Sequence, residues 1–297
     1  MLRKPHLRLI AGHSIRHGIR GGAGLVSMLL TLVLGLTLAS IVISPLEETE
    51  KLADRMNLSD AEKARVTDEM TREITQMTRK VIDWAMDPSP EQLDYLTVDH
   101  PAAVSAILGL LFLITPLLAC LGGFNQTSGD IASRGLRFLL IRTERPNIFL
   151  GRFLGTFVFT AVVFAGLYVI VGIYMAVKIP AYSPSDMLLW LAQGYLRMLV
   201  FALPYVALCS WISASIDSPF GSLVIALLIA YMFPLLVMMA GNINEHAKYL
   251  QYATPWGFKY WLLMPIGPQL FGGIAIMLGF AALTLFAGFR HFSKRDL

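Results

Sequence analysis

Long, uninterrupted apolar stretches dominate the pattern of hydrophobic and polar positions along the chain. Five of these stretches contain no charged residue, and a sixth contains one, Arg197. A charge near the centre of a bilayer costs about 2.5 to 3.5 kcal/mol on insertion scales, and a spanning helix needs about 20 apolar residues. The pattern therefore predicts an all-α membrane protein with six transmembrane helices, at residues 22–44, 102–124, 153–177, 187–213, 219–241 and 268–290.

Residues 1–20, ahead of the first predicted span, repeat apolar positions with a helical period. Ala11 and Ile15 fall on one face of such a helix, while Arg16 and Arg20 fall on the opposite face. A helix of this kind is typical of the membrane surface, where its basic face meets the lipid headgroups. We expect an amphipathic interface helix here.

Residues 45–100, between the first two spans, are polar but periodic. Apolar residues recur there at spacings of four and three, the period of a coiled-coil seam: Met70, Ile74, Met77, Val81 and Trp84. Capping motifs begin at Ser59 and at Ser89, the second with proline at the first helical position. We expect a helical loop whose apolar seam packs on itself, on a second copy of the chain or on another protein.

The distribution of charge orients the predicted spans. Five basic and no acidic residues precede the first span, and residues 125–152 carry five arginines and two acids. Residues 45–100, in contrast, carry seven basic and fourteen acidic residues. Because Lys and Arg concentrate in cytoplasmic segments, both termini and residues 125–150 are predicted to be cytoplasmic and residues 45–100 extracytoplasmic.

Composition supports the membrane assignment and excludes other classes. The chain is 56% hydrophobic and 15% charged, whereas soluble domains are about 25% charged. The net charge of +4 reflects arginines that flank the spans, so no nucleic-acid partner is expected. Cys120 and Cys209 lie inside apolar stretches, where packing is their simplest role.

Residues 125–150 form a polar segment between the second and third spans. Thr127 or Ser128 can cap a helix there, and Asp130 and Arg134 have the i, i+4 spacing of a helical ion pair. This predicts one short charged helix on the cytoplasmic side. Such a helix is too short to be stable alone, so it either docks into another protein or belongs to a solvated connecting loop.

The same segment resembles a known family. The run GDIASRGLRFLL at residues 129–140, the Arg145-Pro146 pair and the run IFLGRFLG at residues 148–155 are similar to the cytoplasmic signature of type-2 ATP-binding-cassette (ABC) exporter permeases. Asp130 replaces the glutamate that is usual in the family, and the threonine that usually follows Gly135 is absent.

The resemblance continues over the rest of the chain. Residues 208–229 are similar to the junction between the fourth and fifth spans of these permeases, and Thr254-Pro255-Trp256 and the tail at residues 289–297 are also similar. The resemblance thus covers residues 1–297 as a single permease domain. The loop after the first span is longer than in compact members of the family.

The resemblance implies a permease subunit of an ATP-driven exporter in the bacterial inner membrane. Its partners would be a second permease copy, identical or different, and two copies of a cytoplasmic ABC ATPase subunit that hold ATP and Mg. An extracytoplasmic protein at residues 45–100 is a further expected partner. The implied ATPase contacts are Asp130, Arg134, Arg137, Arg142 and Glu144, with Arg16 and Arg20 on the interface helix.

The residues themselves also indicate that another subunit binds ATP. The chain contains no Gly-x-x-x-x-Gly-Lys-Ser/Thr phosphate-binding loop, so we expect no enzymatic activity and no cofactor in this chain. His13 and His17 have a spacing that two metal ligands can share, but no third ligand is near them in the sequence, and no metal site is expected. An ATPase-independent channel or scaffold is the alternative function.

Within the spans, Gln193 and Arg197 lie one helical turn apart. A charge inside the membrane indicates either a transport pathway or a structural pair. Trp190 is predicted to lie at the membrane interface with other tryptophans. Residues 242–266 are expected to form an outer loop that dips back into the membrane.

Overall fold

The computed structural model describes residues 4–20, 22–55, 75–83, 88–178 and 183–295, together with residues 65, 69 and 72. Within this part of the chain the regular secondary structure is entirely helical. Six segments are long and apolar enough to cross a membrane. The prediction of an all-α protein with six spans is therefore confirmed.

The helices follow the predicted spans, with several ends that extend beyond the apolar stretches. The five continuous spanning helices are α2 (Gly22–Arg55), α5 (Ala102–Gly123), α8 (Arg145–Lys178), α9 (Pro184–Ser215) and α12 (Pro268–Lys294). The fifth span is divided into α10 (Pro219–Leu227), the π-helical η1 (Leu228–Met232) and α11 (Phe233–Ile243). Shorter helices are α1 (Lys4–Arg20), α4 (Pro90–Thr97), α6 (Ser128–Ala132), α7 (Leu136–Arg142) and the 3₁₀ helices η2 (Glu245–Ala253) and η3 (Pro255–Leu263).

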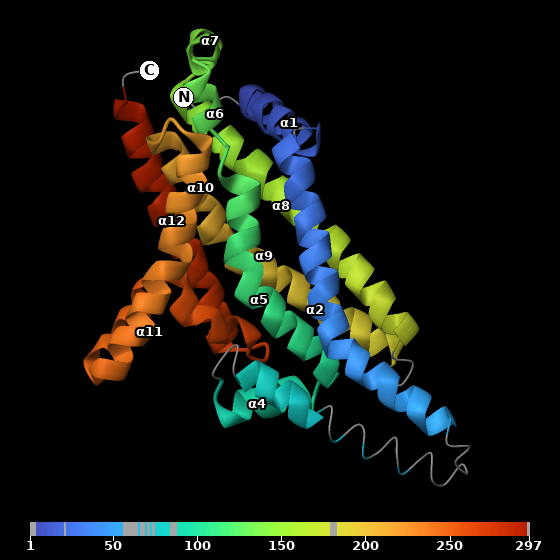
Figure 1. Ribbon diagram of the computed structural model, residues 1–297. Helices are drawn as coiled ribbons and strands as arrows, with labels where there is room; N and C mark the ends of the chain where they lie inside the picture. Colours follow the sequence, from blue (N-terminus) through green and yellow to red (C-terminus); the bar gives the residue numbers. More distant parts are fainter. Residues whose placement is uncertain are drawn as a thin grey trace.

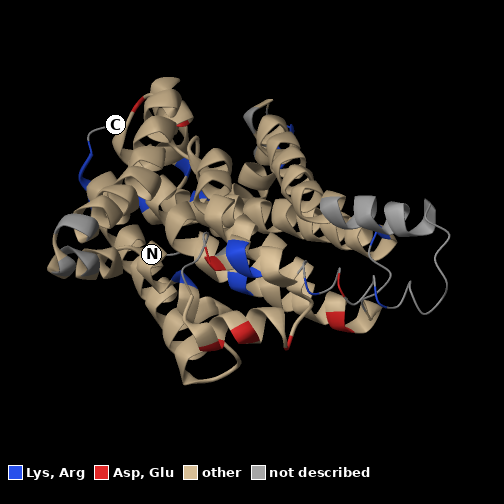
Figure 2. Cartoon of the chain, turned by 60° about the horizontal axis from the view of Figure 1, so that its bottom comes forward, with Lys and Arg blue, Asp and Glu red and all other residues tan. Residues whose placement is uncertain are grey.

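Short helices lie at two opposite ends of the molecule, and the long helices run between these ends. Helices α1, α6 and α7 and both chain termini lie at one end, and α4 lies at the other (Figure 1). Between them, α9 packs against α5, α8 and α12. Charged residues occupy few positions of the ribbon, which is mostly tan in Figure 2. This arrangement is expected of a chain that lipid surrounds.

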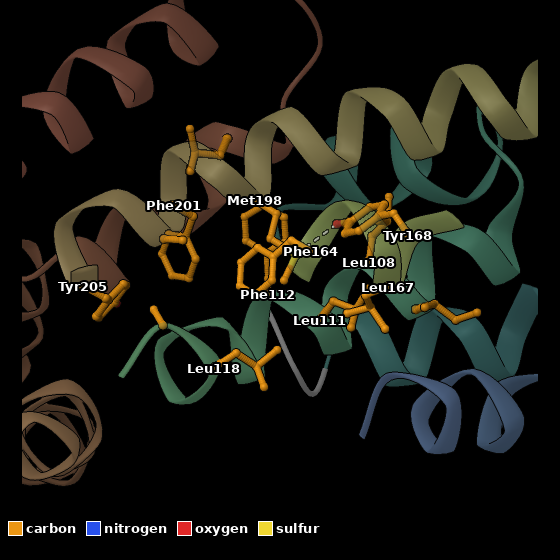
Figure 3. Close-up of a cluster of buried hydrophobic side chains, with 14 of the residues drawn as sticks. Leu108, Leu111, Phe112, Leu118, Phe164, Leu167, Tyr168, Met198, Phe201 and Tyr205 are labelled. Carbon is orange, nitrogen blue, oxygen red and sulfur yellow. Dashed lines mark hydrogen bonds between the residues drawn. The ribbon is translucent and has the colours of Figure 1, made fainter. Parts of the chain in front are cut away.

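The core lies where α5, α8 and α9 meet (Figure 3). Phe112 of α5 stacks on Phe201 of α9 with ring centroids 5.2 Å apart. The buried hydroxyl of Tyr168 donates a hydrogen bond to the sulfur of Met198 at 3.2 Å. These contacts hold the three helices together and fix the rotation of α9, the helix that carries Gln193 and Arg197.

The fifth span departs from a regular helix before Pro234. A proline lacks the backbone N–H and collides with the carbonyl four residues earlier, which here belongs to Ala230 in the π-helical turn. Below this turn α11 leaves the bundle (Figure 1) and packs against η2.

The loop between the first two spans is helical where the structure describes it. Ser89 and Gln92 form the predicted capping box, with Pro90 at the start of α4. Residues 75–83 are also helical, and Arg79 pairs with Asp94 of α4. The loop therefore packs on itself through these residues.

The predicted seam of this loop is only partly described. Met77 is exposed whereas Ile82 is buried, so Met77 does not pack within the described chain, and its packing on a second copy or on another protein stays a prediction. The capping motif at Ser59 and the seam positions at Met70, Ile74 and Trp84 lie outside the described residues.

Candidate functional site

The polar segment between the second and third spans forms two short helices, not the single helix that was predicted. Helix α6 ends at Ala132 with Ser133 as its C-cap, and the next residue, Arg134, has a φ of 56°. A residue in this left-handed region ends an α-helix, although glycine usually occupies the position. Helix α7 then starts at Leu136 in a new direction.

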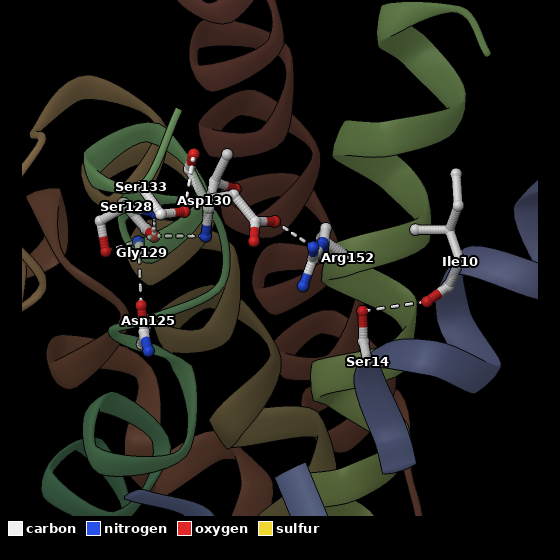
Figure 4. Close-up of polar contacts among 10 residues, drawn as sticks. Ile10, Ser14, Asn125, Ser128, Gly129, Asp130, Ser133 and Arg152 are labelled. Atoms are coloured by element: carbon white, nitrogen blue, oxygen red, sulfur yellow. Dashed lines mark hydrogen bonds and ion pairs between the residues drawn. The ribbon is translucent and has the colours of Figure 1, made fainter. Parts of the chain in front are cut away.

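Helix α6 is capped by side chains from outside it. The buried Ser213 Oγ of α9 accepts hydrogen bonds from the backbone N–H groups of Thr127 (2.8 Å) and Ser128 (2.9 Å). Asn125 Oδ1 accepts from the N–H of Gly129 at 3.0 Å (Figure 4). The hydroxyl of Thr127 makes no capping bond. These contacts fasten the start of the segment to the end of α9.

Asp130 pairs with Arg152 of α8, and the predicted pairing with Arg134 is wrong. Figure 4 shows the carboxylate of Asp130 directed at the guanidinium of Arg152. The side chain of Arg152 is 9% exposed and that of Asp130 is 30% exposed. The break of the helix at Arg134 removes the i, i+4 geometry, and Asp130 instead ties α6 to the start of the third span.

Helix α7 has one buried face and one strongly exposed face. Leu136 is buried in a small apolar cluster with Ile148, Phe149, Ala214 and Phe292, which belong to α8, α9 and α12. On the other face, the apolar side chains of Phe138 and Ile141 are 74% and 82% exposed. The helix protrudes from the end of the molecule that holds both termini (Figure 1).

The charged residues predicted in this segment lie around that exposed face. Arg134, Arg137, Arg142 and Glu144 are all exposed and lie on α7 or within two residues of its ends, whereas Asp130 belongs to α6 and pairs with Arg152. Sequence reasoning selected these charges but missed Phe138 and Ile141. The spacing of three between Phe138 and Ile141, offset from the buried Leu136, was the available signal.

Helix α1 packs against α8, and glycines allow the close approach. A Cβ at Gly155 of α8 would lie 2.6 Å from the carbonyl oxygen of Ala11 and from Cβ of Ser14. His6 of α1 also forms a 3.0 Å hydrogen bond with Thr143, just after α7. Arg16 and Arg20 remain exposed on the outer side of α1, at the same end as α7.

The predicted intramembrane pair lies far along the chain from this segment. Arg197 is 6% exposed and donates from Nη2 to Oε1 of Gln193 at 3.3 Å. Its guanidinium carbon lies 5.0 Å from the ring centroid of Trp190. Trp190 is itself 1% exposed, so its ring packs inside the protein and does not face lipid.

A comparison with protein families matches residues 8–297 to the ABC-2 family transporter protein. The chain belongs to the ABC-2 family. It is a multi-pass membrane protein and the membrane component of an ABC transporter, a class whose members work with an ABC ATPase subunit. The resemblance read from the sequence is confirmed at the level of the family. A search of curated proteins gave no match.

In this ABC-2 permease, the C-terminal end of α12 is fastened to the segment that carries α7. Nη1 of Arg145 lies within hydrogen-bond distance of three carbonyl oxygens at that end, those of Phe292 (3.2 Å), Ser293 (2.6 Å) and Arg295 (2.9 Å). Arg295 in turn pairs with Asp217, between α9 and α10. A cation near the last carbonyls of a helix is favourable both as a donor and against the helix dipole.

Proposed function

We propose that this ABC-2 permease is the membrane subunit of an ATP-driven exporter, and that α7 is the surface through which the ATPase moves it. The observation that carries the proposal is the exposure of Phe138 and Ile141 on a short, protruding helix. Two large apolar side chains beside three exposed arginines are costly to leave in water and suit a groove of another protein.

The contacts of α7 and α6 supply a route for force into the spans. Leu136 of α7 packs in the cluster that joins α8, α9 and α12, and the Asp130–Arg152 pair joins α6 to α8. A push on α7 would therefore reach three spanning helices through buried contacts. On this proposal, closure of the ATPase subunits on ATP rocks these spans and exposes the transport pathway alternately to each side.

The proposed assembly contains two permease copies and two ATPase subunits in the bacterial inner membrane. The first, fifth and sixth spans are the least buried within the chain, which leaves apolar surface for a second copy and for lipid. ATP and Mg²⁺ are assigned to the ATPase, because this chain carries no phosphate-binding loop. Arg16 and Arg20 on α1 are proposed to support the ATPase beside α7, and the loop at residues 45–100 is proposed as the place for an extracytoplasmic partner.

Purification of the permease from its native membrane tests the proposal. We expect an ATPase with a phosphate-binding loop to copurify, and Phe138→Asp or Ile141→Asp to lower its recovery at least tenfold, the effect of about 1.4 kcal/mol. A charge reversal, Arg134→Glu, is expected to weaken the same association. Met77→Asp is the matched control, since Met77 is an exposed apolar residue of the loop that packs on α4, at the opposite end.

The outcome distinguishes the exporter from the alternative of a channel or scaffold that works without an ATPase. Retention of the ATPase and of its permease-stimulated ATP hydrolysis in both aspartate variants would contradict the assignment of α7. Absence of any ATPase from the natural complex, with cargo still moved by the purified chain, would favour the alternative.

A further inference from the structure

The fourth span contains a buried cation that no anion of the described chain neutralises. Arg197 is 6% exposed, and none of the described carboxylates lies within ion-pair distance of it. Its Nη1 atom is buried without a hydrogen-bond partner among the described residues. An unpaired buried charge is costly, so a group that supplies the missing negative charge would bind there favourably.

A second buried polar atom near Arg197 also has no partner in the described part of the chain, Nε2 of His100. The imidazole of His100 stacks on Trp190 with ring centroids 3.7 Å apart and an interplanar angle of 7°, and Arg197 lies beside the same indole ring. Burial, and then the charge of Arg197, lower the pKa of His100, while Asp99 opposes the shift. A neutral His100 can donate one further hydrogen bond to an anion without adding charge.

A cavity of about 440 Å³ leads to this cluster from the end of the molecule that holds α4. His100, Trp190 and Gln193 all line it, and Gln193 carries the hydrogen bond to Arg197. Asp99 and Asp186 also line the cavity and are exposed. The two carboxylates therefore lie on the solvent-exposed part of the cavity lining, and Arg197, which does not line the cavity, lies behind Gln193.

We propose that this cavity binds a zwitterionic group, with its ammonium at Asp99 and Asp186 and its phosphate or carboxylate at Gln193, where the positive charge of Arg197 behind Gln193 attracts it. Each charge of the ligand would lie near a protein charge of opposite sign, and this complementarity provides the recognition. A purely anionic ligand would be repelled by the two aspartates on entry. The volume suits a headgroup or a small amino-acid-like molecule. Two exposed apolar residues that line the cavity, Val98 and Leu189, suit the chains of a lipid.

The inference does not depend on the proposed ATPase coupling, because binding is measured without nucleotide. The full-length chain in detergent, with any ATPase that copurifies, would be titrated with short-chain phosphatidylethanolamine and with short-chain phosphatidylglycerol, which keeps the phosphate but lacks the ammonium. Glycerophosphoethanolamine, which lacks the acyl chains, separates a lipid from a free zwitterion. Dissociation constants and the ligand-induced rise in thermal midpoint are the readouts.

We expect phosphatidylethanolamine to bind more tightly than phosphatidylglycerol, and Arg197→Gln to weaken its binding at least tenfold, through loss of the positive charge behind Gln193. Arg197→Lys should retain part of the affinity. Asp99→Asn combined with Asp186→Asn should remove the preference between the two lipids. Arg290→Gln is the matched control, because Arg290 is an exposed arginine of α12.

A further measurement separates binding from a structural role of Arg197. Without ligand, the thermal midpoint of Arg197→Gln should equal or exceed that of the natural chain, since the substitution removes an unneutralised charge. A lower midpoint combined with unchanged lipid affinity would overturn the proposal. Equal binding of both lipids by the natural chain, or no binding of any zwitterionic probe, would also overturn it.

Discussion

Asp130 and Arg152 form an ion pair that joins α6 to α8. Arg152 is almost fully buried, whereas Asp130 is partly open to solvent. When one member of such a pair is removed, the other remains buried without a compensating charge, and that loss exceeds the value of the contact itself. The pair therefore holds α6 against α8 more firmly than an exposed pair would.

We expect Asp130→Asn to lower the free energy of unfolding by about 2 kcal/mol, the size of a charged hydrogen bond. The matched control is Asp94→Asn, because the Arg79–Asp94 pair is exposed on both sides and such pairs contribute about 0 to 1 kcal/mol. Thermal or denaturant unfolding in detergent gives both values. A loss at Asp130 no larger than at Asp94 would mean that the buried pair contributes little.

The partner of Asp130 in this ion pair could not be predicted from the sequence. The i, i+4 rule selected Arg134 because it assumes one continuous helix, and nothing local to Ser133, Arg134 and Gly135 requires the left-handed turn that breaks it. The partner Arg152 lies 22 residues further along the chain. Which arginine pairs with Asp130 depends on how α8 packs near α6, and this is set by tertiary structure.

At the scale of elements, helices α1 and α8 pack with their backbones very close together. The absence of side chains at Gly151 and Gly155 lets α1 approach, because a Cβ at either position would meet α1 atoms at 2.9 Å or less. Close approach of helices through small residues is a common packing mode in membranes, where dispersion contacts drive association. The amphipathic helix predicted from the sequence is thus part of the bundle.

Substitution of Gly155 by alanine should separate α1 from α8. The added Cβ would lie 2.6 Å from the backbone oxygen of Ala11, and backbone cannot move aside as a flexible side chain can. We expect faster amide hydrogen exchange and faster trypsin cleavage at Arg16 and Arg20. Gly166→Ala on the same helix is the control, since nothing lies within 4 Å of its Cβ position. Unchanged exchange in α1 of the Gly155 variant would show that α1 is held by other contacts.

The end of α12 provides a second prediction at this scale. Removal of the Arg145 guanidinium, as in Arg145→Gln, should free the carbonyls of its last turn and fray the helix near Ser293. Hydrogen exchange should increase at residues 290–295 and stay unchanged at residues 270–280 in the same helix. Equal protection of both stretches in the variant would mean that the Arg295–Asp217 pair alone holds this end.

The elements differ in how far the sequence predicts them, for physical reasons. The six spans follow from hydropathy, because each must supply its own apolar length. The capping box at Ser89 is equally local, since its partners are three residues apart. The division of α6 from α7, the burial of Trp190 and the packing of α1 on α8 depend on contacts distant in sequence, which periodicity does not encode.

In the whole molecule, the two sites proposed to be functional lie at opposite ends. The end with both termini holds α7, whose exposed apolar residues are proposed to meet the ATPase, and the end with α4 holds the cavity beside His100. Helix α9 runs between them: Ser213 caps α6 at one end, and Gln193 lines the cavity nearer the other. Movement of α9 is therefore a direct way to link a push on α7 to the cavity.

This arrangement requires a defined orientation in the membrane, and that orientation can be tested with single cysteines. The native Cys120 and Cys209 are both 0% exposed, so they should react little with a membrane-impermeant maleimide. Glu91→Cys on α4 should be labelled in intact cells, because the acidic loop is predicted to be extracytoplasmic. Ile141→Cys on α7 and Ser293→Cys near the C-terminus should be labelled only after the membrane is permeabilised. The reverse pattern would place α7 outside, where no cytoplasmic ATPase can reach it, and the proposed coupling would be wrong whatever the family assignment.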